Sequence, residues 1–230
     1  MEVGSEPSED IFLMFETIFR KHGDLPEVLN FSVQLRRYPF DSDIGGPMLA
    51  ELKGFIAQPG YIPEPDDGWY FDVFDMRSQH AMNAFHVLAD EHALLKKALD
   101  TSDLDYLGAV AHFERVWVSE PMRGRGIALR LMREANQVLA RYGLLVVLKA
   151  HPDGDKISNA ACLKLASYYQ SDKRLGLRAV SKRKFPGWLV AIWDEPIVNT
   201  DDQLFLHDEA TVAIGDPSDE LQDARPIPST

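Results

Sequence analysis

The feature that most constrains the fold lies at residues 116–128, which read Val-Trp-Val-Ser-Glu-Pro-Met-Arg-Gly-Arg-Gly-Ile-Ala. The pattern predicts a strand that turns through a glycine-rich loop into a helix. The first N–H groups of such a helix are free and lie at the positive end of its dipole. Gly124 and Gly126 allow close approach of phosphate oxygens, and Arg123 and Arg125 add positive charge. The segment predicts a pyrophosphate site, with a plain turn carrying two solvated arginines as the alternative.

Two common phosphate-binding loops do not match this segment. A dinucleotide-binding loop needs a small residue at its third glycine position, which here is Leu129, and an acidic residue about 20 positions later. Residues 144–150 contain no acidic residue. A Walker loop needs Gly-Lys-Ser/Thr, which the sequence lacks.

The loop instead resembles the coenzyme A motif of the GNAT superfamily of acetyltransferases. That motif reads Arg/Gln-x-x-Gly-x-Gly/Ala after a strand that ends in Val-x-Val. Arg123, Gly126 and Ala128 match the motif, and Val116 and Val118 precede it.

A second GNAT-like signature follows about 40 residues later. Residues 165–169 read Leu-Ala-Ser-Tyr-Tyr and residues 175–177 read Leu-Gly-Leu, similar to a helix tyrosine shortly before Leu-Gly-Phe. The family usually spaces this tyrosine four residues before the glycine, whereas Tyr169 lies seven before Gly176. The two signatures together extend the resemblance over about residues 106–193.

The resemblance implies an α/β (mixed α+β) fold, a single GNAT-like domain with a central mixed twisted sheet flanked by helices. It also implies acetyl-coenzyme A as cosubstrate and direct acetyl transfer to an amine. The backbone from Val116 through Trp117 to Val118 would hold the pantetheine arm. The pyrophosphate would be held by Arg123, Gly124, Arg125, Gly126, Ile127 and Ala128.

Catalytic candidates follow from the resemblance and from the strand pattern. The family's helix tyrosine, which protonates the leaving thiolate, corresponds to Tyr169, with Tyr168 as the alternative; both could instead be packing residues. An alkyl amine has a pKa near ~10, so a base is useful. Alternation places His112 and Glu114 on the same strand face as Val116 and Val118, which makes either a candidate base. A polar strand end that faces solvent is the alternative.

Hydrophobic periodicity predicts the remaining elements. The expected helices and strands, in chain order, are a helix over 10–21, strands over 29–38, 48–57 and 69–74, a helix over 78–99, a strand over 106–118, a helix over 126–142, a strand over 144–148, a helix over 159–169, and strands over 175–182 and 188–193. The strand, helix and strand from residue 106 to residue 148 predict a parallel crossover.

Domain limits and partners follow from composition. We expect a disordered lead at 1–10, one GNAT-like domain at 11–194 and an acidic tail at 195–230. The net charge of −12 disfavours nucleic acid and suits a cationic small-molecule or protein amine. One cysteine, no apolar run of membrane-spanning length and no signal peptide lead us to expect a cytoplasmic protein without membrane contact. No metal site is expected, and a homodimer is left open.

Three hypotheses remain at this point. The first is an active N-acetyltransferase. The second is an acyl-coenzyme A-binding sensor or interaction module without catalysis, favoured by the altered spacing after Tyr169. The third is another α/β domain whose loop binds a different phosphate ligand.

Overall fold

The computed structural model describes residues 11–25, 28–39, 46–57, 73–90, 92–152 and 158–198. The lead expected at 1–10 lies outside these residues, as does the tail beyond residue 198. Most of the strand expected at 69–74 also lies outside them.

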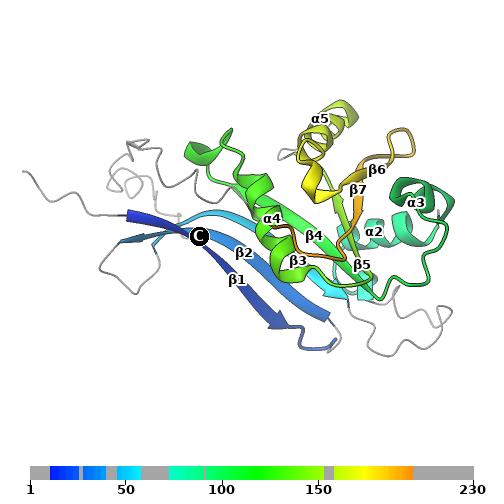
Figure 1. The fold of residues 1–230 in the computed structure, drawn as a ribbon, viewed down its shortest axis with the longest axis horizontal. Helices are drawn as coiled ribbons and strands as arrows, with labels where there is room; N and C mark the ends of the chain where they lie inside the picture. The colour runs from blue at the N-terminus through cyan, green and yellow to red at the C-terminus, as the bar shows by residue number, and fades with distance from the viewer. Residues whose placement is uncertain are drawn as a thin grey trace, which may run out of the picture. The chain divides into compact units, whose positions relative to one another are not determined.

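A seven-stranded mixed sheet forms the framework of the domain, in the order β1-β2-β3-β4-β5-β7-β6 (Figure 1). Its strands are β1 (Ile11–Lys21), β2 (Val28–Pro39), β3 (Met48–Ala57), β4 (Ala109–Val118), β5 (Leu144–Lys149), β6 (Arg178–Ser181) and β7 (Phe185–Ile192). Among the described strands, β4 and β5 pair in parallel, and every other neighbouring pair is antiparallel. The predicted mixed sheet and the parallel crossover are therefore confirmed.

Helices cover both faces of the sheet. They are α2 (Gln79–Ala89), α3 (His92–Leu99), α4 (Ile127–Leu139) and α5 (Asn159–Tyr169). Apolar residues of α4 and α5 share one core cluster with β2, β3 and β4. Apolar residues of α2 and α3 share a second cluster on the opposite side, with β5 and β7. The sheet is thus the middle of three layers, as its buried central strand β5 requires.

The helix predicted over residues 10–21 is wrong, because this segment is strand β1. It pairs with β2 along its full length, from Ile11 with Pro39 to Lys21 with Leu29. The segment is rich in isoleucine and phenylalanine, which suit a strand. Both faces of this strand carry apolar residues. Some of these residues therefore fall at the spacing of a helix, although the segment is a strand. As an edge strand it leaves Phe19 44% exposed.

Two further predictions need correction between residues 73 and 99. Val73, Phe74 and Asp75 are helical, so the end of the strand expected at 69–74 is wrong. The single helix expected over 78–99 is divided into α2 and α3, and Asp90 is the C-cap of α2. Ser78 does cap α2 as predicted, since its side chain accepts a hydrogen bond from the N–H of Ala81.

Strand β4 contains the irregularity that shapes the centre of the sheet. Lys53 of β3 pairs with Arg115 and Gly54 pairs with Phe113, so Glu114 is an extra, bulged residue. Gly54 permits the bulge, because a Cβ there would meet the carbonyl of His112 and the ring of Phe31. Pairing of β4 with β5 ends at the same level, at Phe113 with Leu148. The last five residues of β4 therefore have no neighbour in β5.

The turn after α5 explains the unusual spacing of Tyr169. Residues Lys173–Leu175 form a 3₁₀ turn capped by Asp172. Asp172 forms ion pairs with Arg133 of α4, at 2.7 Å, and with Arg174, at 3.0 Å. Burial opposes ionisation of Asp172, but these hydrogen bonds outweigh it and hold the pKa of its carboxyl below its ordinary value. The extra residues are thus a tethered turn that leaves α5 intact.

Substitution of Gly54 tests the packing of the bulge. Gly54→Ala places a methyl group against backbone, so we expect a loss of about 1–3 kcal/mol in unfolding free energy, measured by urea denaturation. Gly23→Ala is the matched control, because a Cβ at Gly23 has no atom within 4 Å. Equal stability of the two variants would contradict the tight packing at Gly54.

Candidate active site

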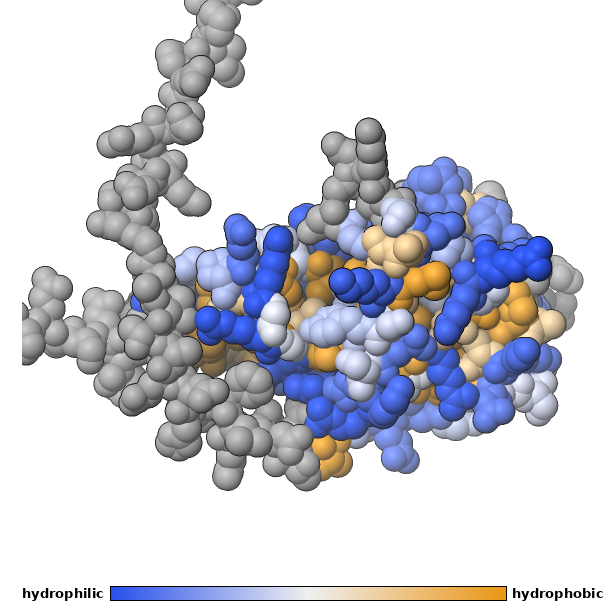
Figure 2. Space-filling model, turned by 90° about the horizontal axis from the view of Figure 1, so that it is seen from above, coloured by the Kyte–Doolittle hydropathy of each residue, from blue (hydrophilic) through white to orange (hydrophobic). Residues whose placement is uncertain are grey.

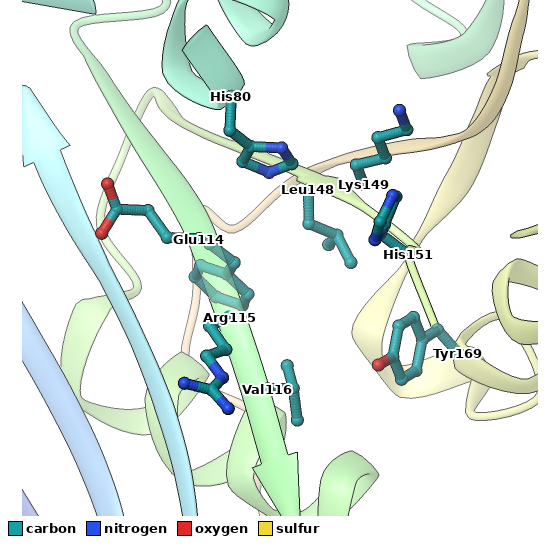
Figure 3. A pocket seen from close by; sticks show the side chains of 9 residues that line it. His80, Glu114, Arg115, Val116, Leu148, Lys149, His151 and Tyr169 are labelled. Carbon is teal, nitrogen blue, oxygen red and sulfur yellow. The ribbon is translucent and has the colours of Figure 1, made fainter. Parts of the chain in front are cut away.

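A cavity opens where β4 and β5 stop pairing. It is lined by residues of α2, β4, β5, the segment after β5, and α5, namely His80, Phe113, Glu114, Arg115, Val116, Leu148, Lys149, His151 and Tyr169 (Figure 3). We call it the central cavity. The cavity forms because β4 continues beyond its last pair with β5. Side chains, and no neighbouring backbone, therefore line the space beside the end of β4.

A second cavity, the loop cavity, lies along the glycine-rich loop. Its lining comprises Val116, Val118, Met122, Arg123, Gly124, Gly126, Ile127, Ala128, His151, Pro152, Leu165, Tyr168 and Tyr169. It shares Val116, His151 and Tyr169 with the central cavity, so the two adjoin at these residues. Of the nine predicted cofactor residues, seven line the loop cavity, whereas Trp117 and Arg125 do not.

The loop has a backbone that suits an anionic ligand. Gly124 and Gly126 both have φ of +75°, and a Cβ built on either would have no atom within 4 Å. Gly126 is the N-cap of α4, and no side chain caps the helix. The first-turn N–H groups thus adjoin open space beside Arg123, whose Nε donates to the carbonyl of Val118 at 3.1 Å. These residues fit a pyrophosphate.

The two candidate tyrosines occupy different positions. Tyr169 is buried, at 6% exposure, and lines both cavities. Its hydroxyl points toward Val116 (Figure 3). Tyr168 is 39% exposed and lines only the loop cavity. Burial raises the pKa of Tyr168, against the opposing effect of a hydrogen bond with the backbone of Leu129 in the first turn of α4.

The shared strand face predicted for His112, Glu114, Val116 and Val118 is wrong. Val116 and Val118 pack against the α4 side of the sheet. The bulge reverses the alternation, so His112 contacts Phe55 and Trp188 on the α2 side. His112 is fully buried and does not line the central cavity.

Glu114 lines the central cavity but is held by an ion pair. Its carboxylate lies 3.4 Å from Nη2 of Arg77, and its side chain is 26% exposed. Figure 3 shows the carboxylate turned away from Tyr169 and His151. Of the two predicted bases, only Glu114 can therefore reach the cavity.

The structure adds His80, Lys149 and His151 to the residues around the central cavity. His80 belongs to the first turn of α2 and is half-buried. No local motif marks it, and its sequence position 32 residues before His112 gives no sign that the two rings lie 5.2 Å apart. Only the packing of α2 against β4 and β5 brings it to the cavity.

The surface view shows how apolar groups are distributed on one face. In Figure 2, apolar areas lie between hydrophilic side chains and do not merge into one continuous patch. Among the described residues, no helix is long and apolar enough to cross a membrane.

Strand β4, the glycine-rich loop and α4 lie beside a strand that separates from β4, and a cavity runs along the loop. Residues 66–166 match the model of the acetyltransferase (GNAT) family. The match includes β4, the loop, α4 and β5, and it ends before Tyr168 and Tyr169. No curated protein and no solved structure matches the chain. The fold and the match over residues 66–166 together support membership of the GNAT superfamily.

The buried His112 should make stability depend on pH. Burial, then the positive charges of His80 and Arg77, lower the pKa of His112 from 6.5 to about 3. Between these values the unfolded chain binds a proton that the folded chain does not, so stability falls as pH falls through this window. His112→Phe should reduce this slope by up to about 1.4 kcal/mol per pH unit, measured by urea unfolding between pH 7 and 5.

The control for this variant is the exposed His92, replaced in His92→Gln. This change should leave the slope as in the wild type. A slope that His112→Phe does not alter would show that His112 titrates alike in the folded and unfolded chains.

Proposed function

We propose that this protein is an N-acetyltransferase that transfers an acetyl group from acetyl-coenzyme A directly to an amine. The observation that carries the proposal is the meeting of the loop cavity and the central cavity at Val116, His151 and Tyr169. The first cavity suits a pyrophosphate, and the second has space for an acceptor beside a buried tyrosine. Two adjoining sites of this kind fit a reaction that proceeds through a ternary complex.

Individual residues take roles that fit their positions. The backbone of Val116 and Val118 holds the pantetheine arm, and the loop from Arg123 to Ala128 holds the pyrophosphate. Acetyl-coenzyme A supplies the acetyl group as a thioester. Tyr169, which lines both cavities, donates a proton to the leaving sulfur. Tyr168 lies against α4 and belongs to the binding surface.

The described lining of the central cavity contains charged residues of both signs. The charged residues that line the central cavity include Glu114, Arg115 and Lys149. Cations thus accompany the carboxylate there, although the whole chain has a net charge of −12. The described lining of the central cavity is therefore less acidic than the chain as a whole.

The first test is calorimetric titration of the purified full chain with acetyl-coenzyme A. We expect micromolar binding by the wild type and loss of at least about tenfold in affinity, or 1.4 kcal/mol, in the double variant Arg123→Glu, Gly126→Asp. The new carboxylates would repel the pyrophosphate at the loop. Arg178→Glu is the control, since this exposed residue of β6 lies outside both cavities. A well-folded wild type that does not bind would refute the proposal.

The second test separates catalysis from binding alone. Tyr169→Phe should lower kcat by about 10²–10⁴-fold and leave the affinity for acetyl-coenzyme A unchanged, because only the proton donor is lost. Release of free thiol in a screen of amines gives the rate. Tyr142→Phe, at a position 78% exposed, is the control. Binding of acetyl-coenzyme A without turnover of any amine by the wild type would favour the sensor hypothesis.

A further inference from the structure

We propose that His80 is the general base that takes the proton from the acceptor amine in the central cavity. This inference rests on the proposed acetyl transfer and adds to it a residue that neither the glycine-rich loop nor the helix tyrosine indicates. It also replaces His112 and Glu114 as the candidate bases.

The position of His80 is set by its helix. The cap at Ser78 fixes the start of α2, and Ala81, Ala84 and Val87 bury one side of the helix against the sheet. His80 then projects into the central cavity from the α2 side, while Tyr169 lines it from α5 (Figure 3). The proposed base and the proposed proton donor thus reach the same cavity from opposite faces of the sheet.

Stacking holds the ring of His80. Its centroid lies 5.7 Å from Trp188 at an interplanar angle of 18°, and 5.2 Å from His112 at 32°. Among the described residues, none forms a hydrogen bond with its Nε2. A ring that is oriented by aromatic faces keeps this nitrogen atom for proton exchange. This is the arrangement that a positioned base requires.

Titratable and charged groups surround His80. They are Lys149 of β5 and His151 after it, Glu114 and His112 of β4, and Arg77 before α2. Burial, then Lys149 and His151, lower the pKa of His80 from 6.5, whereas Glu114 raises it. At neutral pH the imidazole is therefore unprotonated, which is the form that accepts a proton.

The two earlier candidates lack this combination of access and freedom. His112 is fully enclosed and can only support the ring of His80. Glu114 is paired with Arg77, whose guanidinium also lies 4.0 Å from the centroid of the Phe55 ring. Glu114 thus acts on His80 through its charge.

The proposed step converts an amine and a thioester into an amide and a free thiol. The amine nitrogen attacks the thioester carbonyl carbon, so that a C–N bond forms and the C–S bond breaks. His80 accepts the proton that leaves the nitrogen, and Tyr169 gives its proton to the sulfur, which departs as a thiol. Solvent returns the two residues to their starting protonation states.

The test uses the full chain, acetyl-coenzyme A and four probe amines: glycinamide, butylamine, spermidine and aniline. With whichever amine gives the highest turnover, kcat/KM is measured from pH 5 to 9. The wild type should lose activity on the acid side as His80 becomes protonated. His80→Gln should lower kcat/KM by about 10²–10⁴-fold, abolish this acid limb and bind acetyl-coenzyme A as the wild type does. His92→Gln, at an exposed position of α3, should behave as the wild type.

Two neighbouring variants test the same role without altering His80. Glu114→Gln removes a charge that raises the pKa of His80, so the acid limb of this variant's pH profile should move to lower pH. Lys149→Met removes a charge that lowers it, so its limb should move to higher pH. These opposite shifts remain measurable even where His80→Gln folds poorly.

Full activity of His80→Gln, or loss of the acid limb in Glu114→Gln with its retention in His80→Gln, would overturn the role of His80 and leave the proposed function intact. A wild type that binds acetyl-coenzyme A and acetylates none of the four amines would overturn the proposed acetyl transfer, and this inference with it.

Discussion

The hydrogen bonds between β4 and β5 stop at Phe113 and Leu148, and the rest of the candidate site depends on this limit. Up to that level the two strands form the buried middle of the sheet. Beyond it, β4 continues for five residues while β5 ends at Lys149. The bulge at Glu114 bends β4 at the same level, because a bulge increases local twist and disrupts pairing. Backbone groups of β4 that would otherwise bind a neighbouring strand thus become available to a ligand.

The separation of the strands gives each face of the sheet its own part of the site. On one face, α4 begins at the end of the glycine-rich loop and α5 contributes Tyr169. On the other, α2 contributes His80, which stacks on Trp188. The ion pairs of Asp172 connect the turn after α5 to α4. Tyr169 and His80, the proposed proton donor and proton acceptor, therefore belong to helices that pack in separate core clusters.

The predictions from sequence succeeded where the signal was local. The loop, α4, β5 and α5 were found because a glycine pair, a buried apolar run and a helical stripe each depend on neighbouring residues. The prediction for β1 failed because its pairing with β2 overrides a helical spacing of apolar residues. The face assigned to His112 failed because one extra residue, Glu114, reverses the alternation. A bulge of this kind depends on the contact between Gly54 and β4, which lie far apart in sequence.

By itself, the sequence determined that a strand, a glycine-rich loop and a helix follow one another, and that they belong to a mixed sheet. The anion site at the loop stays a prediction. Backbone conformation and helix dipoles are properties of short segments, so their residues suffice to predict them. Only the tertiary structure decided which side chains meet in the central cavity. His80 and Tyr169 lie almost 90 residues apart, and their placement depends on the packing of α2 and α5 on opposite faces of the sheet. The face of the sheet on which a helix packs depends on the burial of apolar surface between residues far apart in the sequence. A local sequence pattern therefore does not predict that face.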